Sequence, residues 1–348
     1  MLLCTQESEQ DRTNVSLRFS LFNFLITQKM AKSTNILLLE TISPEADARL
    51  REQANIFIAT APDTGKEIAA KETIHAIITR GKGDVSAALI DLCPALKVIA
   101  RCGVGLDNVD VSHATEKGVR VVNAPGSNAD TVAEHTLGLM LSLQRHTFAA
   151  ITAVKAGNWA SRNNFGGDEI RGKTLGILGY GNIGRRVEVL ANAFGMEVLH
   201  LAHPQVQAKD DGATARDLGA LLAEADILTI HLPLNTTTRQ LLNATALYQT
   251  KPGALVINTA RGEIIDERAL LVGLESGRIG GYASDVLTTE PPAINSELIA
   301  HPNVLITPHA ASLTARTYNH MCVLTVNNAL DLLAGKEVDR RYVFNAVG

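Results

Sequence analysis

The feature that most restricts the fold of this chain is an alternation of short aliphatic runs with helix-like stretches, which occurs in two series. The first series begins at Asn35 with NILLLE and continues through NIFIAT, AIITR and LKVIARCGVG. The second begins at residue 174 with TLGILGYG and continues through MEVLHLA, DILTIHLPL, GALVINTARG and GGYASDV. Because repeated strand–helix–strand units form parallel sheets, the sequence predicts an α/β protein with two Rossmann-like, doubly wound domains.

Two helical segments stand outside this alternation. Residues 129–145, ADTVAEHTLGLMLSLQR, carry apolar side chains around much of a helix surface, so they are predicted to form a buried connecting helix. Residues 311–333 form a second helical pattern, and its length suits packing against the first domain.

Composition narrows the class of protein. A chain of 348 residues exceeds what one hydrophobic core usually serves, so two domains are expected. The net charge of the chain is −4, and its acidic and basic residues are interspersed, so there is no basic face of the kind that binds nucleic acid.

The four cysteines lack C-x-x-C spacing, which indicates neither a metal site nor a disulfide framework and fits a cytoplasmic protein. No apolar run reaches the roughly 18 residues of a membrane-spanning helix.

Residues 1–33 are expected to be a disordered extension outside the fold. Their stretch LRFSLFNFLIT (17–27) is apolar but short, is interrupted by Arg18 and follows three acidic residues. A signal peptide carries a basic region at that place. Met30 is an alternative start, and no function is assigned to the extension.

A glycine-rich loop connects the first strand of the second series to a helix. Gly179, Gly181 and Gly184 of G-Y-G-N-I-G follow TLGIL and open RRVEVLANAFG, which is the context that a dinucleotide-binding fingerprint requires. The first glycine permits a tight turn, the second lets a pyrophosphate approach the backbone, and the third allows close helix–strand packing. The free N–H groups at the start of the helix face the anion. The loop therefore predicts a dinucleotide cofactor.

The residue that normally selects between NAD and NADP is atypical. An acid about 20 residues after the loop usually binds the adenosine ribose, whereas this chain has Ala202 at that place. No acid repels a 2′-phosphate, yet no Arg or Lys follows immediately to bind one. Our hypothesis is that the protein uses either NAD or NADP, with His203 as the nearest candidate partner of the phosphate.

Three side chains at predicted strand ends could carry acid–base chemistry. Arg261 follows ALVINTA, Glu290 follows GGYASDVLTT and His309 follows NVLITP, and the carboxyl ends of parallel strands line the ligand crevice. Arg261 can donate two hydrogen bonds to a carboxylate. Glu290 beside His309 would favour the imidazolium, which is a proton donor. Taken singly, Glu290 before two prolines is more typical of a surface turn, and the other two are equally consistent with turn residues.

Taken together, these motifs resemble those of the D-isomer-specific 2-hydroxyacid dehydrogenases. The resemblance rests on RCGVGLDNVD, NAPGSNADTVAEH, the glycine loop, NTARGEIIDERAL, ASDVLTTEPP and TPHAAS, in this order, and runs from about residue 35 to residue 340. It implies an oxidoreductase of the CH–OH group that transfers a hydride reversibly between NAD(P)H and a small 2-oxo acid. It also implies that Arg261 binds and polarises the substrate, that Glu290 orients the imidazole, and that His309 transfers the proton.

The resemblance implies further contacts and a domain plan. A discontinuous, flavodoxin-like substrate domain would comprise residues 34–127 and 310–348, and residues 128–309 would form the NAD(P)-binding domain, through which a homodimer forms. Asp285 would lie near the nicotinamide amide and the active-site His. Substrate contacts are implied for Val104 and Gly105, with Asn128 at the domain boundary, and cofactor contacts for Asn182, Ile183, Leu232, Pro233, Thr259 and Ala260.

The sequence leaves the identity of the acid open. Arg80 and Lys82 lie on the loop TRGKG after the strand AII, where two cations suit a phosphate or a second carboxylate. A solvated basic loop is equally compatible with them. For a short family member without a regulatory domain, the resemblance leaves 3-phosphoglycerate, hydroxypyruvate and glyoxylate as alternatives.

Two other classes of function are alternatives to a dehydrogenase. The same resemblance extends to corepressors that bind a dinucleotide mainly as a sensor, and such a protein could keep all three catalytic residues. A serine hydrolase is disfavoured, because the sequence contains no G-x-S-x-G elbow.

Overall fold

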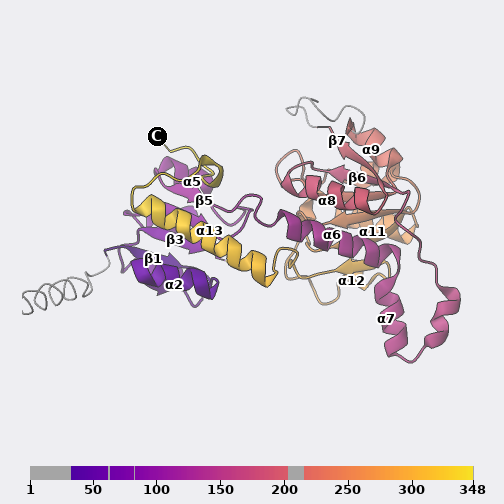
Figure 1. Cartoon of the computed structure of the whole chain (residues 1–348), viewed down its shortest axis with the longest axis horizontal. Coiled ribbons are helices and arrows are strands. Elements are labelled where there is room, and N and C mark those ends of the chain that lie inside the picture. Colours follow the sequence, from indigo (N-terminus) through magenta and orange to yellow (C-terminus); the bar gives the residue numbers. More distant parts are fainter. Residues whose placement is uncertain (1–32, 62, 82, 203–214, 348) are drawn as a thin grey trace, which may run out of the picture. The chain divides into compact units, whose positions relative to one another are not determined.

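The computed structural model of the chain describes residues 33–61, 63–81, 83–202 and 215–347, and these form two compact units (Figure 1). Unit 1 comprises the described residues up to Ala124 together with those from Cys322 onward, and unit 2 comprises Pro125–Met321. The chain returns to unit 1 within a single helix, α13 (Ala315–Leu333). The extension expected over residues 1–33, apart from its last residue, and the candidate residues Lys82 and His203 lie outside the described residues.

Unit 1 is built on a five-stranded parallel sheet in the order β2-β1-β3-β4-β5, which is the flavodoxin-like order. The strands are almost uniformly apolar, as Ile36, Leu37 and Leu38 of β1 illustrate, because helices cover both faces of such a sheet. The strands are β1 (Asn35–Leu38), β2 (Asn55–Ile58), β3 (Ala76–Thr79), β4 (Val98–Arg101) and β5 (Arg120–Val122).

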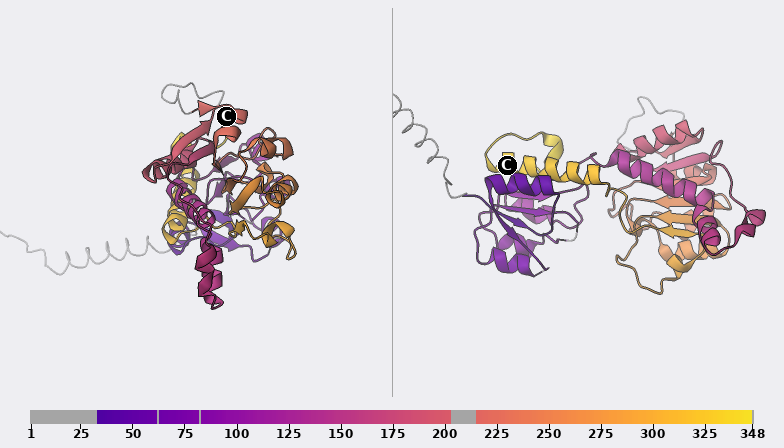
Figure 2. Two further views of the ribbon diagram at one scale, coloured as in Figure 1. Left: turned by 90° about the vertical axis from the view of Figure 1, so that its right-hand side faces the viewer. Right: turned by 60° about the horizontal axis from the view of Figure 1, so that its bottom comes forward.

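The helices of unit 1 form two layers. Helix α2 and the unit 1 part of α13 lie on one face of the sheet (Figure 2), where Arg49 donates a hydrogen bond to Asn327. Ser43 caps helix α2: its hydroxyl accepts from the N–H of Ala46, and Pro44 is the first residue of the helix. The helices are α2 (Pro44–Gln53), α3 (Thr64–Ala69), α4 (Ala87–Asp91) and α5 (Val111–Glu116), and the short 3-10 helix η3 spans Arg340–Tyr342.

Unit 2 is built on a seven-stranded parallel sheet in the order β12-β11-β10-β9-β6-β7-β8. The strand order reverses between β6 and β9, and the carboxyl ends of strands at such a switch point form the ligand crevice of doubly wound sheets. Together with the sheet of unit 1, this confirms the predicted fold class. The strands are β6 (Thr174–Leu178), β7 (Glu197–Leu201), β8 (Ala215–Arg216), β9 (Ile227–Ile230), β10 (Ala254–Asn258), β11 (Ile279–Ser284) and β12 (Val304–Ile306).

The helices of unit 2 pack on both faces of this sheet around apolar cores. Helix α6 packs closely against α8, and its Leu137, Met140 and Leu143 are buried, as expected for residues 129–145. The helices are α6 (Ala129–Gln144), α7 (Thr147–Lys155), α8 (Asn182–Ala193), α9 (Leu218–Glu224), α10 (Ala244–Gln249), α11 (Glu267–Glu275) and α12 (Glu297–Ala300), with 3-10 helices η1 (Trp159–Asn164) and η2 (Gly262–Ile264).

An arm made of α7 and η1 extends from the rest of unit 2 in both Figure 1 and Figure 2. No residue of α7 or η1 is buried. Several large apolar side chains of the arm face solvent, among them Phe148 (64% exposed) and Trp159 (68% exposed). The strand–helix pattern of the sequence did not predict this feature.

No helix among the described residues combines the length and the apolar character needed to cross a membrane.

Candidate active site

The glycine loop lies where β6 meets α8, at the centre of the unit 2 sheet. Gly179 has φ +106°, and a Cβ atom there would come within 2.6 Å of the His231 backbone. A Cβ atom on Gly184 would come within 2.3 Å of the Gly179 carbonyl oxygen. At Gly181, in contrast, no described residue other than its chain neighbours comes within 4 Å of the place of a Cβ. The loop therefore leaves open space at its second glycine, beside the start of a twelve-residue helix, and it fits the pyrophosphate of a dinucleotide.

The predicted cofactor contacts lie on adjacent loops of the same unit. Asn182 and Ile183 form the first turn of α8. Leu232 and Pro233 follow β9, and Thr259 and Ala260 follow β10, which pairs with β9. Since parallel strands end at the same edge of a sheet, unit 2 brings all these residues to one edge.

Arg261 is held at the end of β10 by two backbone contacts. The Asn258 side chain donates to the Arg261 carbonyl at 2.9 Å and accepts from the N–H of Ala260 at 3.0 Å. A Cβ on Gly262 would lie 2.1 Å from the carbonyl carbon of Leu287. The glycine after Arg261 therefore allows this turn to pack directly against the segment that leads to Glu290.

Glu290 and His309 form a hydrogen-bonded pair. The Nδ1 atom of His309 lies 2.8 Å from Oε2 of Glu290, and Oε1 of Glu290 accepts from the N–H of Leu287 at 2.9 Å. The carboxylate is thereby anchored to the backbone, and the His309 Nε2 atom is the ring nitrogen left for a proton transfer. The side chain of His309 is 51% exposed, so its ring is accessible to a substrate.

Asp285 fixes the backbone on which His309 is carried. Its carboxylate, only 2% exposed, accepts from the N–H groups of Ala310 and Ala311 at 2.8 Å each, and its carbonyl accepts from the N–H of His309 at 2.9 Å. His309 has φ +53°, an uncommon left-handed conformation that these bonds maintain.

The sequence reasoning missed three polar residues around this loop. The Thr307 hydroxyl donates to Asp285, and His135 on α6 lies 3.0 Å from that hydroxyl through Nε2 and 3.7 Å from the Asp285 carboxylate. Asn258 is the third, through its contacts with the Arg261 loop. A polar residue closing an apolar strand, as Asn258 closes ALVIN, is a signal that could have identified it. The position of His135 depends on how α6 packs, which the sequence pattern did not indicate.

The candidate substrate residues Arg80, Val104 and Gly105 belong to unit 1, where they follow the adjacent strands β3 and β4. Glu40, at the end of β1, dominates the Arg80 loop. Its Oε1 accepts from the N–H groups of Arg80, Gly81 and Gly83 at 3.1, 2.7 and 2.8 Å, and its Oε2 lies 3.6 Å from the Arg80 guanidinium. The backbone anion site of this loop is therefore filled by a carboxylate of the protein itself.

Asn128, which belongs to unit 2, precedes α6 without capping it through its side chain. Its Oδ1 atom is buried, and within the part of the chain that the structure describes it has no hydrogen-bond partner. A buried acceptor of this kind is unusual in a folded protein, and a ligand donor could satisfy it.

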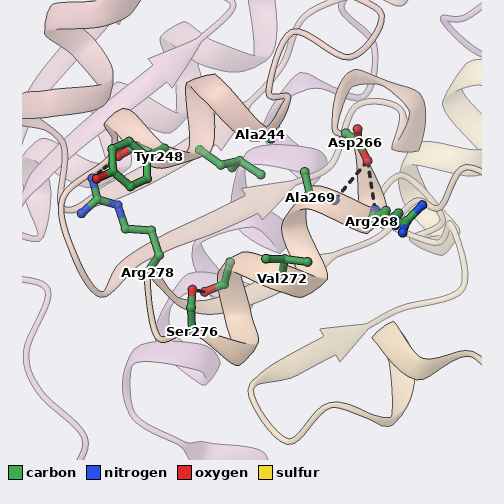
Figure 3. Close-up of a pocket in the computed structure, with 10 residues that line it drawn as sticks. Ala244, Tyr248, Asp266, Arg268, Ala269, Val272, Ser276 and Arg278 are labelled. Carbon is green, nitrogen blue, oxygen red and sulfur yellow. Dashed lines mark hydrogen bonds between the residues drawn. The ribbon is translucent and has the colours of Figure 1, made fainter.

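The described residues contain no group of three side chains suited to hold a metal ion. A pocket of about 440 Å³ lies on unit 2 between α10 and α11 (Figure 3). Tyr248, Val272 and Arg278 contribute to its lining, whereas none of the predicted site residues does. The pocket is therefore separate from the strand ends that carry the candidate catalytic residues.

Comparison with known proteins identifies the family of this arrangement. Residues 137–311, half of the chain, match the model of the "D-isomer specific 2-hydroxyacid dehydrogenase, NAD binding domain". The chain belongs to the D-isomer specific 2-hydroxyacid dehydrogenases. The predicted resemblance is thus confirmed, and the matched segment contains the glycine loop, Arg261, Glu290 and His309.

Individual members of the D-isomer specific 2-hydroxyacid dehydrogenase family are similar over most of the chain. Hydroxypyruvate reductase of Thermotoga maritima is 40% identical over 70% of this chain and 79% of its own. D-3-phosphoglycerate dehydrogenase of Bacillus subtilis is 36% identical over 91% of this chain, which spans only 58% of that relative's length. The structure of an NADPH-dependent glyoxylate/hydroxypyruvate reductase of Sinorhizobium meliloti superposes with a TM-score of 0.79 at 30% identity, covering 88% of this chain and 96% of the other.

Proposed function

We propose that this protein catalyses reversible hydride transfer between a nicotinamide dinucleotide and a small 2-hydroxy or 2-oxo acid. The observation that carries the proposal is the pair of His309 and Glu290, 2.8 Å apart and anchored to the backbone, with the Arg261 turn packed against the segment that leads to Glu290. Its named relatives are oxidoreductases of such acids. No observation favours the dinucleotide-sensing corepressor considered as the alternative.

Each residue has a separate part in the reduction of a 2-oxo acid. A nicotinamide dinucleotide, held at the glycine loop, would supply the hydride for the C2 carbon. Arg261 binds the substrate through paired N–H groups and polarises the carbonyl group. His309 gives the proton on Nε2 to the carbonyl oxygen, and Glu290, bonded to Nδ1, stabilises the imidazolium and fixes the orientation of the ring. In the oxidation direction the neutral ring takes the same proton back.

We propose that the protein accepts both NAD and NADP. Ala202, the last residue described before residue 215, is exposed and cannot repel a 2′-phosphate as an acid would. The domain model is named for NAD, and one similar structure is named for NADPH, so the two comparisons support both cofactors.

For the acid itself, we propose an unphosphorylated 2-oxo acid of two or three carbons, such as glyoxylate or hydroxypyruvate. Glu40 already occupies the N–H groups of the loop from Arg80 to Gly83 and offsets the Arg80 charge. A substrate phosphate would therefore meet a carboxylate at this loop. The prediction that Arg80 and Lys82 bind a phosphate remains the alternative.

We also propose that the protein is a cytoplasmic homodimer. The arm of α7 and η1 exposes Phe148, Ile151 and Trp159, and exposed apolar patches of this kind mark interaction sites. Among the described residues, Cys93, Cys102 and Cys322 form no disulfide, which is usual in a reducing compartment.

The test is a panel of glyoxylate, hydroxypyruvate, 3-phosphohydroxypyruvate, pyruvate and bulkier 2-oxo acids, each assayed with NADH and NADPH. We expect kcat/KM to be highest for glyoxylate or hydroxypyruvate and to differ less than several hundredfold between cofactors. Turnover of no acid, despite tight cofactor binding, would favour the sensor function instead.

Arg80→Ala, with Glu40→Gln as its partner variant, tests the choice of acid. If the loop excludes phosphate, Glu40→Gln should lower KM for 3-phosphohydroxypyruvate and leave KM for glyoxylate nearly unchanged. If Arg80→Ala instead raises KM for the phosphorylated acid much more than for glyoxylate, the loop is a phosphate site and the proposed acid is wrong.

A further inference from the structure

A chain of hydrogen bonds crosses unit 2 beside the predicted cofactor site. It begins at Thr229 in β9, whose hydroxyl oxygen lies 2.9 Å from Nε2 of His231. Nδ1 of His231 lies 3.4 Å from the Thr259 hydroxyl after β10, and this hydroxyl lies 3.1 Å from that of Thr136 on α6. The Thr136 hydroxyl donates to the carbonyl of Val132 at 2.8 Å. The chain thus joins two strand ends and a helix.

The number of protons in this chain fixes the direction of every bond. A carbonyl oxygen can only accept, so Thr136 donates its one hydroxyl proton to Val132 and must accept from Thr259. Because Thr259 donates its own proton to Thr136, its hydroxyl accepts in the bond to His231, and this bond requires a proton on Nδ1. In a neutral ring the Nε2 atom is consequently an acceptor, and Thr229 donates to it.

The surroundings of His231 keep its ring neutral. Desolvation lowers the pKa of His231 from 6.5 to about 3, so a second proton on Nε2 is excluded at neutral pH. The backbone of His231 also packs directly against Gly179 of the glycine loop. His231 therefore contacts the loop that follows β6 and the loop that follows β10. It also immediately precedes Leu232 and Pro233 in the sequence.

We propose that His231 is a positioning residue of the cofactor site, which donates from Nδ1 to Thr259 and thereby couples the loop after β9 to the loop after β10. The inference rests on the proposed function, because Leu232, Pro233, Thr259 and Ala260 are among the residues predicted to contact its cofactor. Because the Thr259 hydroxyl donates its one proton to Thr136 and accepts from His231, both bonds hold its loop in place within unit 2.

The tautomer gives a spectroscopic test that needs no substrate. In protein labelled with ¹⁵N at histidine, long-range ¹H–¹⁵N spectra at pH 7 distinguish a protonated ring nitrogen from an unprotonated one, and the His231→Asn spectrum identifies the signals that belong to His231. We expect Nδ1 to be protonated and Nε2 unprotonated. A proton on Nε2, with Nδ1 unprotonated, would reverse the direction of the hydrogen bonds of His231 and overturn the inference.

Two near-isosteric variants then separate positioning from packing. The amide of Asn can place its N–H group near the position of His Nδ1, whereas the amide of Gln reaches the position of Nε2. We measure the Kd of NADH by fluorescence, and Tm, for His231→Asn, His231→Gln and His231→Leu. We expect Asn to stay within about twofold of the wild type, and Gln and Leu to weaken NADH binding by roughly fivefold to tenfold, the value of one hydrogen bond.

The outcomes distinguish this inference from the proposed function. Equal Kd values for the Asn and Gln variants, or losses that simply follow Tm, would reduce His231 to a packing residue. A wild-type protein that binds NADH with this pattern of variants but reduces no 2-oxo acid would contradict the proposed function and leave the positioning role intact. Binding of neither NADH nor NADPH by the wild type would overturn both.

Discussion

At the scale of single residues, the site depends on one histidine held in an unusual backbone conformation. His309 has φ +53°, a region that few residues other than glycine adopt but in which His, Asn and Asp are enriched. Asp285 secures the N–H groups of the next two residues, and Glu290 secures the ring. Backbone and side chain are therefore fixed by different carboxylates, which leaves Nε2 as the group that acts on a substrate.

His309→Asn tests the proton transfer. Asn tolerates the same backbone conformation but supplies no titrating proton, so kcat for 2-oxo acid reduction should fall on the order of 10²–10⁴-fold with little change in the Kd of NADH. His113→Asn is the control, because His113 forms a similar pair with Asp91 at 2.9 Å on the helices of unit 1. Equal kcat values for the His309 variant and the wild type would remove the assignment.

His231 predicts an acid-dependent loss of stability. Its pKa is lowered to about 3 in the folded protein and lies near 6.5 in the unfolded chain. Between these values the unfolded state binds a proton that the folded state does not. The free energy of unfolding should therefore fall by up to about 1.4 kcal/mol per pH unit as the pH drops below 6.5.

Urea denaturation from pH 7 to pH 5 measures this slope. All other titratable groups are the same in the wild type and in His231→Asn. The difference between the pH dependences of their free energies of unfolding therefore gives the contribution of His231. The variant should lose stability less steeply on acidification. Parallel curves for the two proteins would show that His231 does not carry the effect.

At the scale of elements, glycines decide where backbones touch. Because Gly184 has no side chain, α8 can pack against the Gly179 carbonyl. Gly262 in the same way lets the Arg261 turn pack against the backbone of Leu287 and Thr288. Both contacts join backbone to backbone, so neither neighbour can move aside as a flexible side chain would. Gly138, in α6, has open space around the position of its Cβ.

The same substitution at two helical glycines should therefore have opposite effects. Gly184→Ala places a methyl group 2.3 Å from a backbone oxygen, so we expect lower Tm and loss of NADH binding. Gly138→Ala should raise the free energy of unfolding by about 0.5–1 kcal/mol and leave the Kd unchanged. Thermal denaturation with NADH titration measures both, and a Gly184→Ala protein of normal Tm and Kd would refute the packing argument.

The sequence was sufficient to predict those elements whose form is determined by the pattern of their own residues. The apolar runs of both sheets, the connecting helix α6 and the strand-end positions of Arg261 and His309 follow from local pattern. Glu40 and His135 could not be predicted in this way, because each reaches its partner from a distant segment: 40 residues separate Glu40 from Arg80. The arm also escaped prediction, since α7 has no buried face to give a pattern.

At the scale of the whole molecule, the chain carries its catalytic candidates in unit 2 and its candidate substrate loops, those of Arg80 and Val104, in unit 1. The two cores are separate, and α13 is a continuous element shared by both units. The arm of unit 2 exposes apolar side chains that no described segment of the chain covers.

The exposed apolar residues of the arm lead us to expect a homodimer. Light scattering should give twice the chain mass of 37.2 kDa for the wild type, and Phe148→Asp combined with Trp159→Asp should give a monomer, because charges would replace buried apolar contacts. Tyr248→Asp is the matched control, since Tyr248 is an equally exposed aromatic residue on α10. Dimers that persist in the arm variant would place the interface elsewhere.

The transfer of the hydride from NADH to the C2 carbon of a 2-oxo acid can be followed with an isotope. The protein is incubated with hydroxypyruvate and with NADH that carries deuterium at both C4 positions of the nicotinamide, and the product is resolved by chirality and mass. We expect D-glycerate with one deuterium at C2, formed by the wild type and at a greatly reduced rate by His309→Asn. L-glycerate, or D-glycerate without deuterium at C2, would contradict this expectation.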